Sequence, residues 1–239
     1  MSLYADSRYP VRSDLEAVHT KQLDQLGDPG TWGNSEQRLA VAGEIRRACV
    51  EAGVQEEPEE PQPETKVDLP QAARELIREL AVEPQGFDEA SYKAARSGGL
   101  RDEEYVEVVG IVARLTAMDI FARGIGVPLR PLPTPRDGAP SCVRPAAAKK
   151  EMAWVPTVPN LPEGGEEAEK LYGKNYHPYI FRSLSLVPDE MQRHIELENI
   201  QYLPMNSILI KDYQHHEEFS RAQAETVAGR VSAINECFY

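Results

Sequence analysis

The sequence predicts an all-α fold, and three observations carry that prediction. Apolar residues recur at spacings of three and four along most of the chain, as they do on one face of a helix. Glycine and proline gather between these segments rather than inside them, at the places where helices begin and end. We find no convincing set of segments in which apolar and polar residues alternate as strands require.

The first helical segments lie in the N-terminal quarter of the chain. A weakly amphipathic piece runs from Leu15 to Leu26. A longer helix is expected from Ser35, which we predict as its cap, to Gly53, which would end it. Residues 55–68 are acidic and rich in proline, which is typical of a solvated loop or a disordered insertion.

Three further helices are expected before residue 126, over residues 69–80, 88–96 and 102–123. The third is apolar nearly all the way round, which predicts a central, buried position. Asp119 lies inside this apolar segment and is a candidate buried carboxylate. The alternative for Asp119 is an ordinary place at a helix edge, bonded to a neighbour.

The remainder divides into a connector and a second helical part. Residues 127–165 form a long proline-rich connector of the kind that joins two halves or wraps another subunit. Helices are expected over residues 166–171, 188–203 and 220–234. The predicted organisation is therefore an N-terminal half (1–126), the connector (127–165) and the start of a C-terminal half (166–239).

Composition excludes several classes of partner. The 239 residues carry a net charge of −13, so an acidic surface would repel nucleic acid and anionic lipid. No run of about 18 apolar residues occurs, and the N-terminus has no secretory pattern, so we expect a cytoplasmic protein without a membrane partner.

The cysteines and histidines predict no metal site. The three cysteines, Cys49, Cys142 and Cys237, are odd in number and widely spaced, which disfavours a disulfide scaffold or a zinc site. His215 and His216 could ligate metal, but adjacent histidines point in different directions, and we interpret them as part of a solvated loop. We therefore expect neither a metal nor a cofactor.

The last helix carries the chain's most specific motif. Glu225 lies twelve residues before Cys237, across a segment reading Glu-Thr-Val-Ala-Gly-Arg-Val-Ser-Ala-Ile. This spacing resembles the approach to the catalytic cysteines in the alkylhydroperoxidase D and carboxymuconolactone decarboxylase-like superfamily. That family's pattern is a glutamate, eleven residues, then Cys-x-x-Cys-x-x-x-His. The second cysteine and the histidine would be residues 240 and 244, so the sequence is expected to be cut off inside the motif.

Two longer stretches support the same resemblance. Residues 100–129 resemble the helix-and-exit segment of two-copy, peroxidase-related members, although Arg101 stands where those members usually carry a small capping residue. Residues 183–203, followed by Glu225 and Cys237, form the second stretch. The resemblance implies a helical bundle of two related halves. Residues 39–48 are also similar in sequence to residues 225–234, either by duplication or by chance. Aligning the two segments sets Leu39 against Glu225 and Glu51 against Cys237. A first copy of the repeat would therefore lack the catalytic groups.

The resemblance also implies a chemistry for these residues. A thiolate attacks a hydroperoxide, and a second cysteine resolves the sulfenic acid as a disulfide. Glu225 matches the glutamate of the proton relay, and Cys237 matches the first, resolving cysteine. The attacking cysteine and the histidine have no counterpart among the 239 residues. Straight helix would separate Glu225 from Cys237 by about 18 Å, so a break near Asn235 or a second chain is needed for them to meet.

The sequence leaves three functions open. The first is a thiol-dependent hydroperoxide-reducing, antioxidant oxidoreductase related to the peroxidases, inactive as these 239 residues stand. The second is a non-catalytic helical scaffold or interaction module. The third is a decarboxylase-like acid/base enzyme of the same fold, using a carboxylate such as Asp119. The resemblance implies a homo-oligomer, and the peroxidase hypothesis implies a thiol reductant as partner.

Overall fold

The chain folds into helices, as the sequence predicts. The computed structural model describes residues 2–204, 207–208, 210–214 and 217–237. Its helices are α1 (Ser13–Asp24), α2 (Ser35–Glu51), α3 (Gln71–Val82), α4 (Glu89–Ser97), α5 (Asp102–Gly124), α6 (Gly165–Tyr172), α7 (Tyr179–Arg182), α8 (Pro188–Gln201) and α9 (Arg221–Ile234), with single turns of tighter helix at η1 (Gln25–Gly27) and η2 (Pro84–Gly86). Among the described residues the only β-type pairing is an isolated bridge between Lys149 and Thr157. The all-α prediction is confirmed.

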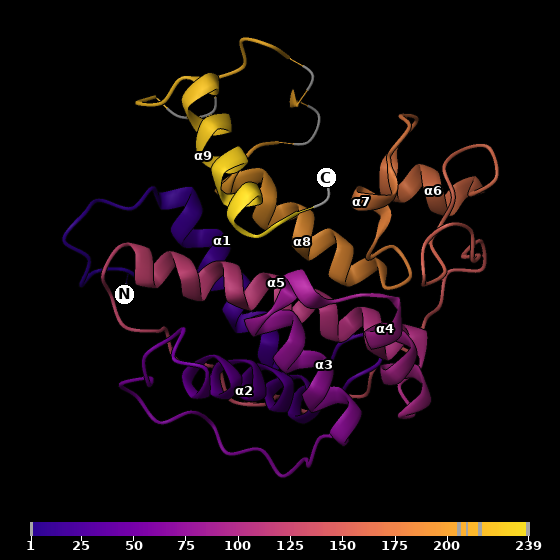
Figure 1. Cartoon of the computed structure of the whole chain (residues 1–239), viewed down its shortest axis with the longest axis horizontal. Coiled ribbons are helices and arrows are strands. Elements are labelled where there is room, and N and C mark those ends of the chain that lie inside the picture. Colours follow the sequence, from indigo (N-terminus) through magenta and orange to yellow (C-terminus); the bar gives the residue numbers. More distant parts are fainter. Residues whose placement is uncertain (1, 205–206, 209, 215–216, 238–239) are drawn as a thin grey trace.

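Helix α5 is the axis of the bundle, because it offers apolar side chains in every direction. Val106, Ile111 and Leu115 are all essentially inaccessible to solvent. Figure 1 shows α5 running through the middle, with α2 and α3 on one side and α1 and α8 on the other. The central position expected for residues 102–123 is therefore confirmed.

The beginning of α2 differs from the sequence prediction. The cap is Asn34 rather than Ser35: the Asn34 side chain accepts from the backbone N–H of Gln37, and the Gln37 side chain accepts in return from the Asn34 backbone. Ser35 instead donates its hydroxyl to the carbonyl of Arg136, 2.6 Å away. Asn34 and Ser35 are both common capping residues, so the sequence alone does not show which of them caps the helix. The hydrogen bond from Ser35 to Arg136, 101 residues away, leaves the cap to Asn34.

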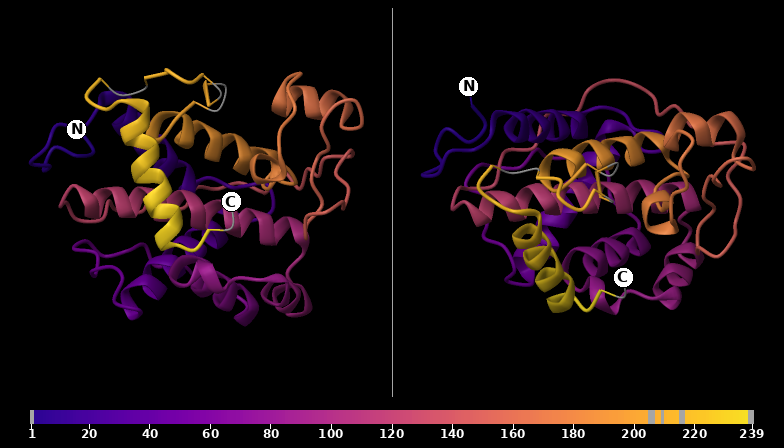
Figure 2. Two further views of the ribbon diagram at one scale, coloured as in Figure 1. Left: turned by 45° about the horizontal axis from the view of Figure 1, so that its top comes forward. Right: turned by 90° about the horizontal axis from the view of Figure 1, so that it is seen from above.

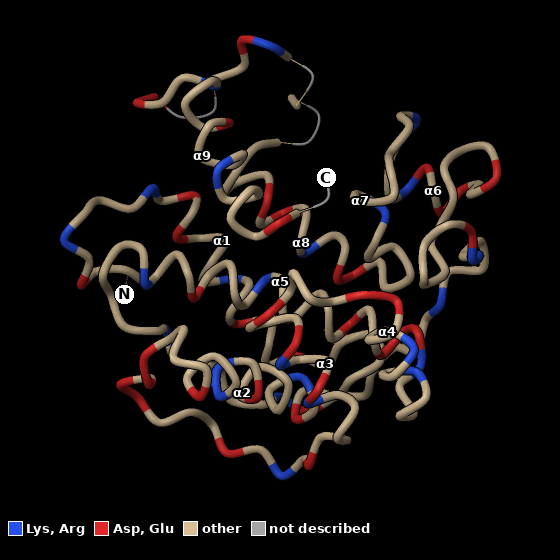
Figure 3. The backbone as a smooth tube through the Cα atoms, in the orientation of Figure 1, with Lys and Arg blue, Asp and Glu red and all other residues tan. Residues whose placement is uncertain are grey.

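The two proline-rich segments have different roles. Residues 55–68 form an exposed loop without helix, and Figure 3 shows acidic residues along it between α2 and α3. The connector from residue 127 is hydrogen-bonded to the segment between α1 and α2. The backbone N–H of Arg136 donates to the carbonyl of Gly27, and that of Cys142 donates to the carbonyl of Thr31. Val158 in the same connector is fully buried. The connector is thus part of the packed structure.

One hydrophobic core draws on both sides of the connector. Leu39 and Leu115 from the first part belong to the same buried cluster as Leu186, Met191 and Leu197 from the second. Tyr4, Ala122 and Val127 form a small satellite cluster at the end of α5. The division into two related halves stays a prediction.

Helix α9 lies on the outside of this bundle. None of its residues is buried, and Val227, Val231 and Ile234 are each at least half exposed. Figures 1 and 2 show it at the periphery, beyond α8. The sequence predicts that this helix begins at Ser220, and the Ser220 side chain caps it by accepting from the backbone N–H of Gln223. No helix in the described part of the chain is long and apolar enough to cross a membrane.

Candidate functional site

Glu225 lies near the beginning of α9, where it is held by two neighbours. Its Oε1 accepts from Nε of Arg221, one turn earlier, at 2.6 Å. Its Oε2 accepts from the hydroxyl of Tyr202 at 2.9 Å, just after the end of α8. These contacts fix the carboxylate between α8 and α9, partly open to solvent.

Cys237 lies at the other end of the same helix. Helix α9 ends at Ile234, close to the break expected near Asn235, and Glu236 adopts a positive φ of 52°. The backbone N–H of Cys237 then bonds to the carbonyl of Ser232, and its thiol is exposed. The ten helical residues from Glu225 to Ile234 span about 14 Å, and the Glu225 carboxylate bonds to Arg221 and Tyr202 rather than to the thiol.

The other two cysteines have contrasting environments. Cys49 is buried on α2, near the carbonyl of Ala81, and burial raises the pKa of its thiol. Cys142 is exposed in the connector, with a positive φ of 52°. All three cysteines are free thiols.

The histidines give no metal centre in the part of the chain that the structure describes, where no three metal-capable side chains converge. His215 and His216 lie outside the described residues. His177 lies before α7, its ring Nε2 3.1 Å from the carbonyl of Tyr172. His194 is half-buried on α8, and burial lowers the pKa of its imidazole.

Asp119 is buried, as its place in the apolar helix suggests. Both of its oxygens accept from Arg46 of α2, from Nε at 2.9 Å and from Nη2 at 2.8 Å. Nη1 of Arg46 bonds in turn to Gln62, which attaches the acidic loop to the bundle. Burial raises the pKa of Asp119, and the Arg46 guanidinium opposes that rise. Asp119 is therefore bonded to a neighbour, as the alternative interpretation expected, but it is buried and not at an exposed helix edge. Its use in acid/base catalysis stays a prediction.

Sequence reasoning missed the largest polar feature, a buried network of arginines and glutamates between α2, α5 and α8. Nη1 of Arg38 donates to Glu107 at 2.6 Å and to Glu190 at 2.9 Å. Glu190 also accepts from Nη2 of Arg114 at 2.5 Å and from Nη1 of Arg193 at 2.7 Å. All but Arg193 are almost inaccessible to solvent.

Two glycines make room for this network. A Cβ at Gly110 would lie 2.9 Å from atoms of the Glu190 side chain, so glycine allows α8 to approach α5 closely. A Cβ at Gly30 would lie 1.8 Å from Oε1 of Glu107. The signal in the sequence was Gly110 followed one helical turn later by Arg114, a charge inside an apolar helix.

The network carries one more positive than negative charge. Three guanidinium groups surround the two carboxylates of Glu107 and Glu190. Burial alone would raise the pKa of Glu190, but Arg114, Arg38 and Arg193 outweigh it and hold that pKa well below its usual range. Burial would lower the pKa of Arg38, and the two carboxylates raise it instead. The charged forms of Glu190 and Arg38 are therefore favoured, whereas burial lowers the pKa of the Arg114 guanidinium.

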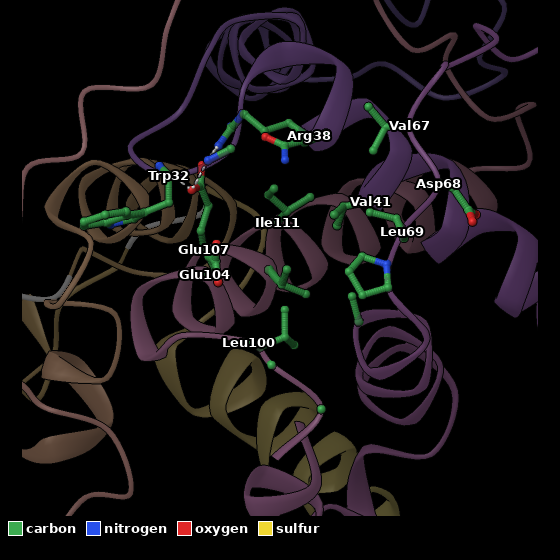
Figure 4. Close-up of a pocket in the computed structure, with 17 residues that line it drawn as sticks. Trp32, Arg38, Val41, Val67, Asp68, Leu69, Leu100, Glu104, Glu107 and Ile111 are labelled. Carbon is green, nitrogen blue, oxygen red and sulfur yellow. Dashed lines mark hydrogen bonds and ion pairs between the residues drawn. The ribbon is translucent and has the colours of Figure 1, made fainter. Parts of the chain in front are cut away.

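A cavity of about 350 Å³ lies beside Arg38, between α2, α3 and α5. Its apolar wall is formed by Val41, Leu69, Ala73, Leu100, Val108 and Ile111. Figure 4 shows Arg38, Glu107 and Trp32 on one side of this space and Val67, Asp68 and Leu69 on the other. The volume falls within the range of small-molecule sites in proteins.

Comparisons with known proteins add no relative: no protein family, curated protein or solved structure matches this chain.

Proposed function

We propose that this chain is a peroxidase-related helical protein of the alkylhydroperoxidase D-like type, in which Cys237 is the resolving thiol and Glu225 the proton-relay carboxylate. The observation that carries the proposal is the Glu225-to-Cys237 spacing. Two structural features support it. Glu225 is held in place by Arg221 and Tyr202, and Cys237 follows the end of its helix with an exposed thiol.

The reaction proposed for this family assigns Cys237 one step. An attacking thiolate forms a sulfur–oxygen bond to the hydroperoxide, the oxygen–oxygen bond breaks, and an alcohol leaves. The resolving thiol then displaces water from the sulfenic acid to form a disulfide, which a thiol reductant reduces. The attacking cysteine and the histidine of the family's motif have no counterpart among the 239 residues, so these residues alone should turn over peroxide negligibly.

Peroxide consumption tests this proposal. With a dithiol reductant, the 239-residue chain should consume hydroperoxide no faster than its Cys237→Ser variant. Turnover by the 239 residues that Cys237→Ser abolishes would instead make Cys237 the attacking thiol.

Thiol reactivity gives a second test on the same chain. Cys142 and Cys237 are exposed and should react rapidly with iodoacetamide, whereas Cys49 should react only after unfolding because it is buried and its pKa is raised. Mass spectrometry of peptides from the native protein measures this order. Slow labelling of Cys237 would contradict a role as an accessible resolving thiol.

The second candidate is a non-catalytic helical interaction module. It is favoured by the distance along α9 between Glu225 and Cys237 and by the absence of buried residues in that helix. A Cys237→Ala variant should then keep the cellular role of the protein. A phenotype from this substitution alone would exclude the module and favour thiol chemistry.

A further inference from the structure

The cavity beside Arg38 is built differently from a simple packing defect. Its walls are mostly apolar, but one side consists of the buried guanidinium and carboxylate of Arg38 and Glu107. The side chain of Asp68, also at the cavity, is 91% exposed, so this part of the rim reaches solvent. An apolar chamber with one buried cation at its edge is the usual form of a small-molecule site.

Two of the three guanidinium nitrogens of Arg38 have no hydrogen-bond partner. Only its Nη1 is engaged, by Glu107 and Glu190. Its Nε and Nη2 are buried and have no partner. These two nitrogens form one edge of the guanidinium, the edge that matches both oxygens of a carboxylate. Leaving buried donors without a partner is unfavourable, and a ligand carboxylate would remove that penalty.

The charges around the cavity favour a single negative charge. The buried network carries a net positive charge, because Arg38, Arg114 and Arg193 face only two carboxylates. The other acidic residues of the wall are already paired: Glu104 with Arg101 at 2.8 Å, and Asp68 with Arg74. A monoanion neutralises the excess, whereas a phosphate dianion would leave a buried charge uncompensated.

We propose that the cavity between α2, α3 and α5 binds a small organic monocarboxylate, its carboxylate on Nε and Nη2 of Arg38 and its apolar body against Val41, Ala73 and Ile111. Both donors are covered in the ligand-free protein, so binding includes a local movement of the wall around Arg38. The site shares no residue with α9 and does not depend on Cys237.

Titration calorimetry at pH 7 tests the proposal with sodium hexanoate and sodium benzoate. One equivalent of each should bind, with a dissociation constant below about 1 mM. The neutral hexanamide and benzamide have nearly the same shape and should bind about 10- to 100-fold more weakly, because they cannot form the charged pair. Equal binding of acid and amide, or no binding at all, would overturn the proposal.

Matched variants locate the site. Ala73→Leu fills the cavity without touching the network and should reduce affinity at least about tenfold, whereas Ala81→Leu, on the same helix but outside the cavity, should bind as the parent does. Arg38→Lys keeps the charge but loses the forked edge, and should also lose the preference for acid over amide. If Arg38→Lys does not fold, Ala73→Leu and Ala81→Leu still locate the site. Equal affinities of these two variants for hexanoate would place the ligand outside the cavity.

The carboxylate-binding proposal and the thiol-chemistry proposal can be tested independently of each other. Cys237→Ser should bind hexanoate unchanged, because Cys237 is not among the residues that line the cavity. A loss of binding in that variant would mean that the carboxylate sits near α9 and not on Arg38.

Discussion

At the scale of single residues, Glu190 holds the most consequential position in the molecule. It is fully buried, and it accepts hydrogen bonds from Arg38, Arg114 and Arg193. Neutralising it would leave two buried guanidinium groups short of a counter-charge. The penalty for such a break greatly exceeds the small net stability that the intact network provides.

We therefore predict that Glu190→Gln lowers the free energy of unfolding by about 3–5 kcal/mol. Urea denaturation measures the change. The control is Glu196→Gln on the same helix, which removes an exposed ion pair with Lys21 and should cost less than about 1 kcal/mol. Similar stabilities for the two variants would show that the network is hydrated rather than buried.

His19 gives the stability a dependence on pH. It is fully buried, its Nδ1 lies 2.6 Å from the Tyr4 hydroxyl, and its Nε2 lies 3.0 Å from the Gln201 side-chain oxygen. Burial lowers the pKa of its imidazole, and the Gln201 contact only partly opposes this. Because the folded state favours neutral His19, its contribution is complete above the unfolded pKa of about 6.5 and is lost as pH falls below it.

The expected result is a fall in unfolding free energy between pH 7.5 and pH 5.5 that is smaller in His19→Gln than in the parent. Denaturation at the two pH values measures each difference. A parent-like slope in His19→Gln would assign the pH dependence to another group, such as half-buried His194.

At the scale of elements, local patterns were enough for most helices. The predicted bounds of the segment 102–123 agree with α5 to within one residue, because its apolar run lies between strong stop signals. The last helix was expected to begin at Ser220, and the structure shows Ser220 as its cap, in a capping box that Gln223 completes. The helix at α2 was predicted, but its cap was assigned to Ser35 rather than Asn34. The two residues compete for the cap, and the distant carbonyl of Arg136 engages Ser35. The four-residue helix α7 was missed.

Helix α9 should contribute little to the stability of the bundle. We predict that Val231→Ala changes the unfolding free energy by less than about 0.5 kcal/mol, because its side chain is half exposed. Leu115→Ala in α5 should cost about 2–5 kcal/mol, because that side chain is fully buried. A large effect of Val231→Ala that grows with protein concentration would indicate that α9 is buried in the expected homo-oligomer.

At the scale of the whole molecule, sequence predicted the class of fold and not its polar centre. Helical periodicity is a local property, so it survives without knowledge of the tertiary structure. The ion pairs of Arg38 and Arg114 join residues 69, 76 and 152 positions apart. Nothing local distinguishes Arg38 from the exposed arginines, and Arg114 is marked only by its place in an apolar helix, one turn after Gly110. The cavity escaped prediction for the same reason, since three helices must pack before it exists.

The same long-range network determines whether the N-terminal part of the chain can fold without α8. Helix α8 supplies Met191 and Leu197 to the common core and Glu190 to Arg38 and Arg114. A fragment of residues 1–165 would keep both arginines and lose their shared carboxylate, so we predict that it has no cooperative unfolding transition. Residues 1–204 lack only α9 and the segment before it, and should unfold cooperatively near the temperature of the whole chain. Circular dichroism during heating measures both fragments. A cooperative transition in residues 1–165 would establish these residues as an independent domain, and their buried arginines would then need another counter-charge.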